Sequence, residues 1–107
     1  MSTHEIPLSR PDITSLEIDA VTAVMRSGRL SIGPMQEQFE ALVAARADRH
    51  FGVACSSGTA GLHMALLALG IGPGDEVITT PFSFIASSTV ILMVGAKPRF
   101  VDICPNT

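Results

Sequence analysis

The sequence predicts an α/β fold with a mainly parallel sheet and flanking helices. Three short apolar runs typical of strands, residues 51–55, 76–80 and 99–103, alternate with apolar runs of helical length at 58–69 and 83–94. Strands that are apolar on both faces and alternate with helices are typical of a parallel sheet covered on both sides. Because three such strands leave unpaired edges, the predicted sheet is incomplete.

A first helix is expected ahead of the sheet, over residues 14–27. Thr14 and Glu17 have capping-box spacing, so each can satisfy N–H groups of the first turn. Gly28 then provides a stop signal. Apolar side chains recur at helical spacing between these signals, and we expect them to form one buried face. They are Leu16, Ile18, Val21, Val24 and Met25.

A second helix is expected to run from Pro34 to about Ala47, because proline suits the first position of a helix. The predicted domain organisation follows from these elements. Residues 1–50 would form a lead-in with two helices, and residues 51–107 would form the start of an α/β domain that is truncated in this chain.

The composition favours an ordinary cytoplasmic protein. The net charge is −3 and the seven Lys and Arg residues are scattered, so nothing indicates nucleic acid or an anionic membrane surface as a partner. The longest apolar runs are shorter than the roughly 20 residues of a membrane span, and no signal-peptide pattern is present. Cys55 and Cys104 lack metal-ligand spacing, so no metal is expected and the thiols are typical of a reducing compartment.

Residues 56–61 read Ser-Ser-Gly-Thr-Ala-Gly and lie between a predicted strand and a predicted helix. Such a turn presents free backbone N–H groups and the positive end of the helix dipole, an arrangement that suits a phosphate. The spacing fits neither the G-x-x-x-x-G-K-[ST] loop nor the G-x-G-x-x-G loop. From these residues alone, the turn is either a phosphate cradle or a plain connector capped by Ser and Thr.

Five linked motifs resemble the DegT/DnrJ/EryC1/StrS family of aminotransferases. Residues 56–63, SSGTAGLH, are similar to the family signature SSGTAALH, and the likeness continues through 72–78, 82–87 and 95–102. Upstream, residues 27–34 resemble the family's "SG-x-L/W-x-x-GP" loop. The resemblance implies the N-terminal portion of the large domain of a fold-type I transferase that depends on pyridoxal 5'-phosphate.

The resemblance also implies four cofactor-binding residues. The backbone around Gly58, Thr59 and Ala60, with the Thr59 hydroxyl, would hold the cofactor phosphate. Phe84 matches the position of an aromatic ring that stacks on the pyridine, and its alternative role is core packing. Many relatives carry Trp, Tyr or His there, so Phe keeps the stacking surface without a polar group. Lys97 matches a non-catalytic position, and no catalytic residue is expected in this chain.

The family's cofactor-bearing lysine and the acid that pairs with the pyridine nitrogen lie further along than this chain extends. Other polar residues are expected to be structural or solvated: His63, Asp75, Glu76 and Asp102. The loop around Ser31 is either a substrate contact or a connector.

The resemblance implies transfer of an amino group from an amino acid, commonly glutamate, to a nucleotide-linked keto-sugar. Relatives act as homodimers that share residues between sites, and this chain alone is expected to be an inactive fragment. Three alternatives remain open at this point. They are a sugar dehydratase of the same family, a small phosphate-ligand binding module that ends at Thr107, and a partial chain that does not fold alone.

Overall fold

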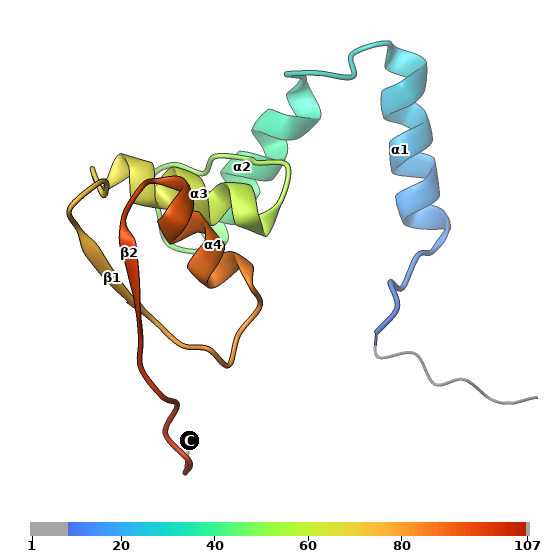
Figure 1. Ribbon diagram of the computed structural model, residues 1–107. Coiled ribbons are helices and arrows are strands. Elements are labelled where there is room, and N and C mark those ends of the chain that lie inside the picture. The colour runs from blue at the N-terminus through green and yellow to red at the C-terminus, as the bar shows by residue number, and fades with distance from the viewer. Residues whose placement is uncertain (1–8, 107) are drawn as a thin grey trace, which may run out of the picture. The chain divides into compact units, whose positions relative to one another are not determined.

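The computed structural model describes residues 9–106 and divides the chain into two compact units. We call them the N-terminal unit, Met1–Ala54, and the C-terminal unit, Cys55–Thr107. Figure 1 labels the helices and strands of both units. The N-terminal unit contains α1 (Ser15–Ser27) and α2 (Pro34–Arg46), and the C-terminal unit contains α3 (Gly58–Ala68), β1 (Glu76–Thr79), α4 (Ala86–Met93) and β2 (Lys97–Phe100).

Helix α1 begins and ends at the predicted signals. The Thr14 N–H donates to Glu17 Oε2 over 2.7 Å, and the Leu16 N–H donates to Thr14 Oγ1 over 3.2 Å, which completes the capping box. The hydrogen bonds from Thr14 lower the pKa of Glu17. Gly28 ends the helix with a φ of 70°, a left-handed conformation that glycine adopts without steric cost.

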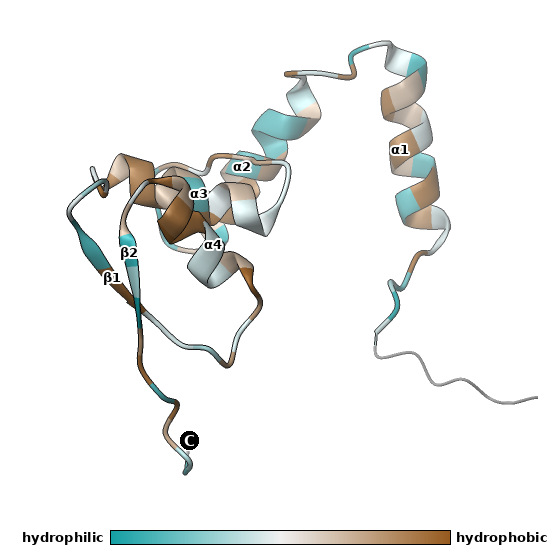
Figure 2. Ribbon diagram, viewed as in Figure 1, coloured by the Kyte–Doolittle hydropathy of each residue, from teal (hydrophilic) through white to brown (hydrophobic). Residues whose placement is uncertain are grey.

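The predicted buried face of α1 is wrong. None of the residues of α1 is buried, and Leu16 and Met25 are 76% and 66% exposed. Figure 2 shows apolar residues distributed along this helix. Periodicity decides which side chains share a face, but burial needs another element to cover that face. Within the described part of the N-terminal unit, α2 is the only other helix, and it leaves this face exposed.

The predicted strand at residues 51–55 is also wrong. This segment follows α2 and is held by a side chain of that helix, because the Ala54 N–H donates to Glu40 Oε1 over 2.8 Å. The same hydrogen bond is the main cause of the lowered pKa of Glu40. A strand requires a hydrogen-bonded neighbour. Among residues 9–106, the two strands present pair with each other and leave none for this segment.

The C-terminal unit confirms the predicted parallel α/β arrangement. Strands β1 and β2 are parallel, with Glu76 opposite Lys97 and Thr79 opposite Phe100. Helix α4 connects them and packs on both strands and on α3, and Figure 1 shows the two helices beside the strand pair. The buried core lies under α4. It consists of Val90, Ile91, Val94 and Ala96, with Leu66, Ile71 and Val77 packed against them.

Glu76 is exposed, as the sequence predicted, and it is also paired across the strands. Arg99 donates to Glu76 Oε1 over 2.6 Å, and this bond lowers the pKa of Glu76. Asp75 likewise accepts a hydrogen bond, from the Gly72 N–H over 2.9 Å, which closes the turn before β1. Because both pairs are exposed, they contribute to local geometry more than to stability.

Two predicted boundaries differ from the structure. The helix predicted from residue 83 begins at Ala86, because the carbonyl of Phe84 instead accepts bonds from the N–H and the hydroxyl of Ser87. The strand predicted at 99–103 lies earlier, at Lys97–Phe100. Its register is set by pairing with β1, starting from the Lys97 N–H, which donates to the Asp75 carbonyl over 2.9 Å.

Candidate functional site

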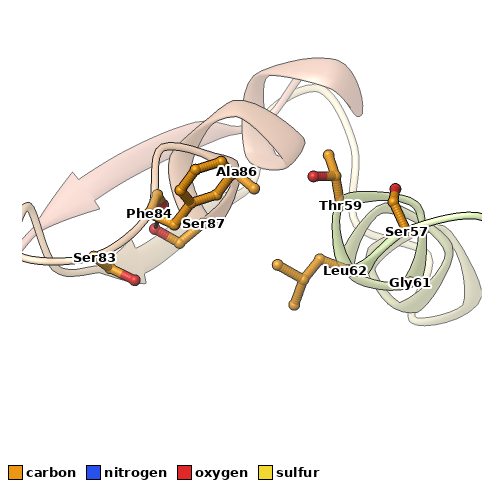
Figure 3. A pocket seen from close by; sticks show the side chains of 9 residues that line it. Ser57, Thr59, Gly61, Leu62, Ser83, Phe84, Ala86 and Ser87 are labelled. Carbon is orange, nitrogen blue, oxygen red and sulfur yellow. Dashed lines mark hydrogen bonds between the residues drawn. The ribbon is translucent and has the colours of Figure 1, made fainter. Parts of the chain in front are cut away.

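The first turns of α3 and α4 line one cavity in the C-terminal unit. Its volume is about 700 Å³. Figure 3 shows the lining residues of α3 on one side and those around the start of α4 on the other. The cavity is lined by Ser57, Gly58, Thr59, Gly61 and Leu62 from the first group and by Ser83, Phe84, Ala86 and Ser87 from the second. None of these side chains is charged, and the N-terminal end of a helix carries a partial positive charge.

The start of α3 leaves two backbone donors unused. Ser57 caps the helix, because its Oγ accepts from the Ala60 N–H over 3.1 Å and its carbonyl accepts from the Gly61 N–H over 3.0 Å. Among the described residues, the N–H groups of Gly58 and Thr59 have no hydrogen-bond partner. A Cβ at Gly58 would meet nothing within 4 Å, so open space lies beside these donors. The turn can therefore accept an anion.

Gly58, Thr59 and Phe84 line the same cavity, although they come from separate parts of the sequence. Ala60 is not among the lining residues, and its N–H already donates to Ser57 Oγ. From the sequence, capping by Ser or Thr was raised only as the alternative to a phosphate cradle, and in the structure Ser57 caps the helix. The signal was present, since a serine directly before a predicted helix is a favoured N-cap.

Phe84 stands across the cavity from Thr59 (Figure 3). Its side chain is 76% exposed and does not belong to the buried core of the C-terminal unit. The backbone of Phe84 is fixed by Ser87, whose N–H and Oγ both donate to the Phe84 carbonyl over 3.0 Å. Sequence reasoning missed the bonds from Ser87 to the Phe84 carbonyl, because they depend on where α4 begins. An exposed ring on a fixed backbone offers a flat apolar face to a ligand.

The remaining candidates lie outside the cavity. Lys97 is the single lysine of the sequence, starts β2 and does not line the cavity. His63 is half-buried in α3 and does not line it either. Within residues 9–106 there is no cluster of side chains that could hold a metal ion. In that same part of the chain, no helix has the length and apolar character needed to cross a bilayer.

A parallel α/β unit with free N–H groups at a helix start has the kind of fold and site at which proteins commonly bind anionic ligands. The comparison with known families identifies the protein family. The model of the DegT/DnrJ/EryC1/StrS aminotransferase family matches residues 11–107, so the chain belongs to this family. The fold expected from the resemblance is confirmed by solved structures.

Two curated relatives and one solved structure illustrate the likeness. The UDP-4-amino-4-deoxy-L-arabinose–oxoglutarate aminotransferase of Shewanella sediminis is 44% identical over 103 residues, which is 96% of this chain and 26% of the relative. The spore coat polysaccharide biosynthesis protein SpsC of Bacillus subtilis is 48% identical over 104 residues, 97% of this chain and 27% of SpsC. The chain thus spans about a quarter of the length of these relatives.

The solved structure is Spr1654 of Streptococcus pneumoniae, a protein assigned as a sugar aminotransferase. Its structure in the pyridoxal phosphate (PLP) form superimposes with a TM-score of 0.91 at 40% sequence identity. The match covers 97% of this chain and 26% of the Spr1654 chain. The same protein is also known in a PMP form, which gives the same TM-score. The fold of residues 9–106 is therefore that of one quarter of a known sugar-aminotransferase structure.

Proposed function

We propose that this chain holds the phosphate and the ring of pyridoxal 5'-phosphate in an aminotransferase. The enzyme would transfer an amino group from an amino acid, commonly glutamate, to a nucleotide-linked keto-sugar. One observation carries the proposal. Gly58 and Thr59, whose N–H groups have no partner among the described residues, line the same cavity as Phe84, whose side chain is exposed. Family membership and the substrate named for the Shewanella sediminis relative support the reaction class.

The residues present fit the cofactor. A phosphate needs several donors and an absence of carboxylates, and the cavity lining contains no acidic side chain. Figure 3 shows the Thr59 hydroxyl on the side of the turn that faces Phe84. This hydroxyl has no partner among the described residues, so it can donate to a phosphate oxygen. The ring of Phe84 supplies an apolar surface for a flat heterocycle.

Each part of the site has a separate role. When bound, pyridoxal phosphate supplies an electron sink for bond changes at the amino-bearing carbon. Gly58 and Thr59 would hold its phosphate, and Phe84 would offer its ring an apolar surface. Because Lys97 lies outside the cavity, this chain places no amine at the site. In our proposal, the catalytic lysine and the acid that pairs with the ring nitrogen come from sequence outside these 107 residues.

The proposal extends to the setting of the enzyme. We place the start of the cofactor-binding domain at residue 51, after a lead-in with two helices. The full-length enzyme would work as a cytoplasmic homodimer on a nucleotide-sugar and an amino acid. No binding to nucleic acid or to membranes is part of the proposed role.

An amination assay tests the reaction. The full-length protein, pyridoxal phosphate, glutamate and a UDP-linked 4-keto-sugar are mixed, and 2-oxoglutarate and the aminated sugar are measured. We expect 2-oxoglutarate to form only when the keto-sugar is present. The 107-residue polypeptide is expected to give no turnover under the same conditions, because it brings no lysine into the cavity.

The products also separate the alternatives. A sugar that has lost water and gained no nitrogen would contradict amination and would favour the dehydratase of the same family. Turnover by the 107-residue polypeptide would contradict the assignment of the lysine to other sequence. Binding of inorganic phosphate without preference for pyridoxal phosphate would favour a plain phosphate-binding module.

A further inference from the structure

The turn at residues 56–61 is the one we propose to hold the phosphate. It differs from the family signature SSGTAALH at one position, where Gly61 replaces the second alanine. We propose that Cys55 and Gly61 act together as a positioning pair that sets the shape of the turn. In this proposal, the Cys55 thiol occupies the space that a methyl group at position 61 would need. The inference rests on the proposed function, because the turn that the pair shapes is the proposed phosphate site.

Two contacts place the thiol. The Cys55 Sγ–H donates to the Ser57 carbonyl over 3.2 Å. The same sulfur would lie 3.3 Å from a Cβ built at Gly61, a separation shorter than ordinary contacts of about 3.5–4.0 Å between non-bonded carbon atoms. Apart from the two chain neighbours of Gly61 and the backbone of its own helix, no other atom lies within 4 Å of that Cβ position. The glycine and the thiol are therefore complementary in shape.

The Ser57 carbonyl joins the pair to the site. It accepts a hydrogen bond from the Cys55 thiol over 3.2 Å and another from the Gly61 N–H over 3.0 Å. Ser57 is the N-cap of α3, and its hydroxyl orients the first turn through the Ala60 N–H. The two residues that follow it, Gly58 and Thr59, carry the free donors. A change in how the Ser57 carbonyl is held therefore changes where these donors point.

The proposed pair predicts a specific effect of adding a methyl group at position 61. In Gly61→Ala the thiol must shift by a few tenths of an ångström, which weakens its bond to the Ser57 carbonyl. Alanine is nevertheless the better residue for a helix interior. The substitution is thus expected to weaken cofactor binding although it favours α3 itself. In Cys55→Ala the smaller side chain leaves room for the methyl group, and the conflict disappears.

A double-mutant cycle in the full-length protein tests the pair. The dissociation constant of pyridoxal phosphate is measured for the wild type, Gly61→Ala, Cys55→Ala and the double variant. We expect Gly61→Ala to raise the constant about tenfold in the wild-type background, and to change it less than about twofold in the Cys55→Ala background. Equal effects in both backgrounds would overturn the inference, because the methyl group would then act without the thiol.

A second readout does not need the cofactor. Alkylation of Cys55 by iodoacetamide is followed by peptide mass spectrometry, with Cys104 measured in the same digest as a reference. Gly61→Ala is expected to speed the alkylation of Cys55 severalfold, because its thiol is held less firmly by the Ser57 carbonyl. An unchanged rate would overturn the pair.

The two readouts keep the proposals apart. A wild-type protein that binds no pyridoxal phosphate would refute the proposed function. The alkylation rate alone would then decide whether Cys55 and Gly61 form the proposed pair. If the cofactor binds and the cycle shows no coupling, the proposed function stands and the pair is refuted.

Discussion

Replacing Phe84 by alanine is expected to raise the dissociation constant of pyridoxal phosphate about threefold to tenfold, as loss of one aromatic stacking partner does. The side chain is 76% exposed and belongs to no part of the core, so the fold should remain intact. The constant is measured by titrating the full-length protein with the cofactor. The unfolding midpoint of the same variant, measured without cofactor, should match that of the wild type.

Phe82→Ala is the matched control for this prediction. Phe82 lies two residues earlier in the same segment and is 79% exposed, but it does not line the cavity. Its removal therefore takes away a similar exposed apolar area outside the site. Equal losses of cofactor affinity in Phe82→Ala and Phe84→Ala would contradict ring stacking by Phe84. An unchanged affinity in Phe84→Ala would contradict it as well.

Replacing Gly52 by alanine is expected to destabilise the chain by about 2–4 kcal/mol. A Cβ at this position would lie 2.5 Å from the carbonyl oxygen of Glu40 and 3.2 Å from its carbonyl carbon. Both atoms belong to the backbone of α2, so no side-chain rotation relieves the clash. The segment must move away, and the hydrogen bond from the Ala54 N–H to Glu40 is then lost.

Denaturant unfolding of Gly52→Ala measures this loss, with Gly72→Ala as its control. A Cβ at Gly72 would approach only the Val94 carbonyl, at 3.8 Å, which is an ordinary contact. We expect the midpoint of Gly72→Ala to stay close to that of the wild type. A wild-type midpoint for Gly52→Ala would mean that residues 51–54 do not pack against α2 as described.

The helices that could be predicted from the sequence are those whose signals are local. The capping box of Thr14 and Glu17, the stop at Gly28 and the proline at position 34 each act within one or two turns, and all three signals lie where expected. The parallel pairing of β1 and β2 also followed from the alternation of strands and helices.

The errors concern features that depend on distant partners. Residues 51–55 have the composition of a strand but bond to the side chain of Glu40 rather than to another strand. The apolar face of α1 has the right period but nothing in its unit covers it. The late start of α4 depends on a bond between Ser87 and the Phe84 carbonyl that composition does not reveal.

In the candidate site, too, local features could be predicted and features that depend on distant residues could not. The turn at Gly58 and Thr59 could be found from local chemistry, since a helix start offers free donors wherever it occurs. Only the resemblance to a family pointed to Phe84 as its partner, and the structure brings both into one cavity. The contact between Cys55 and the empty side of Gly61 could not be predicted, because it depends on the three-dimensional shape of the turn.

The most direct test of the central claim compares pyridoxal phosphate with pyridoxal, which has the same ring and lacks the phosphate. Both are titrated into the full-length protein, and inorganic phosphate is added as a competitor. If the N–H groups of Gly58 and Thr59 hold the phosphate, pyridoxal phosphate should bind at least about tenfold more tightly, and inorganic phosphate should compete with it. Equal affinities for the two compounds, unaffected by phosphate, would contradict the account.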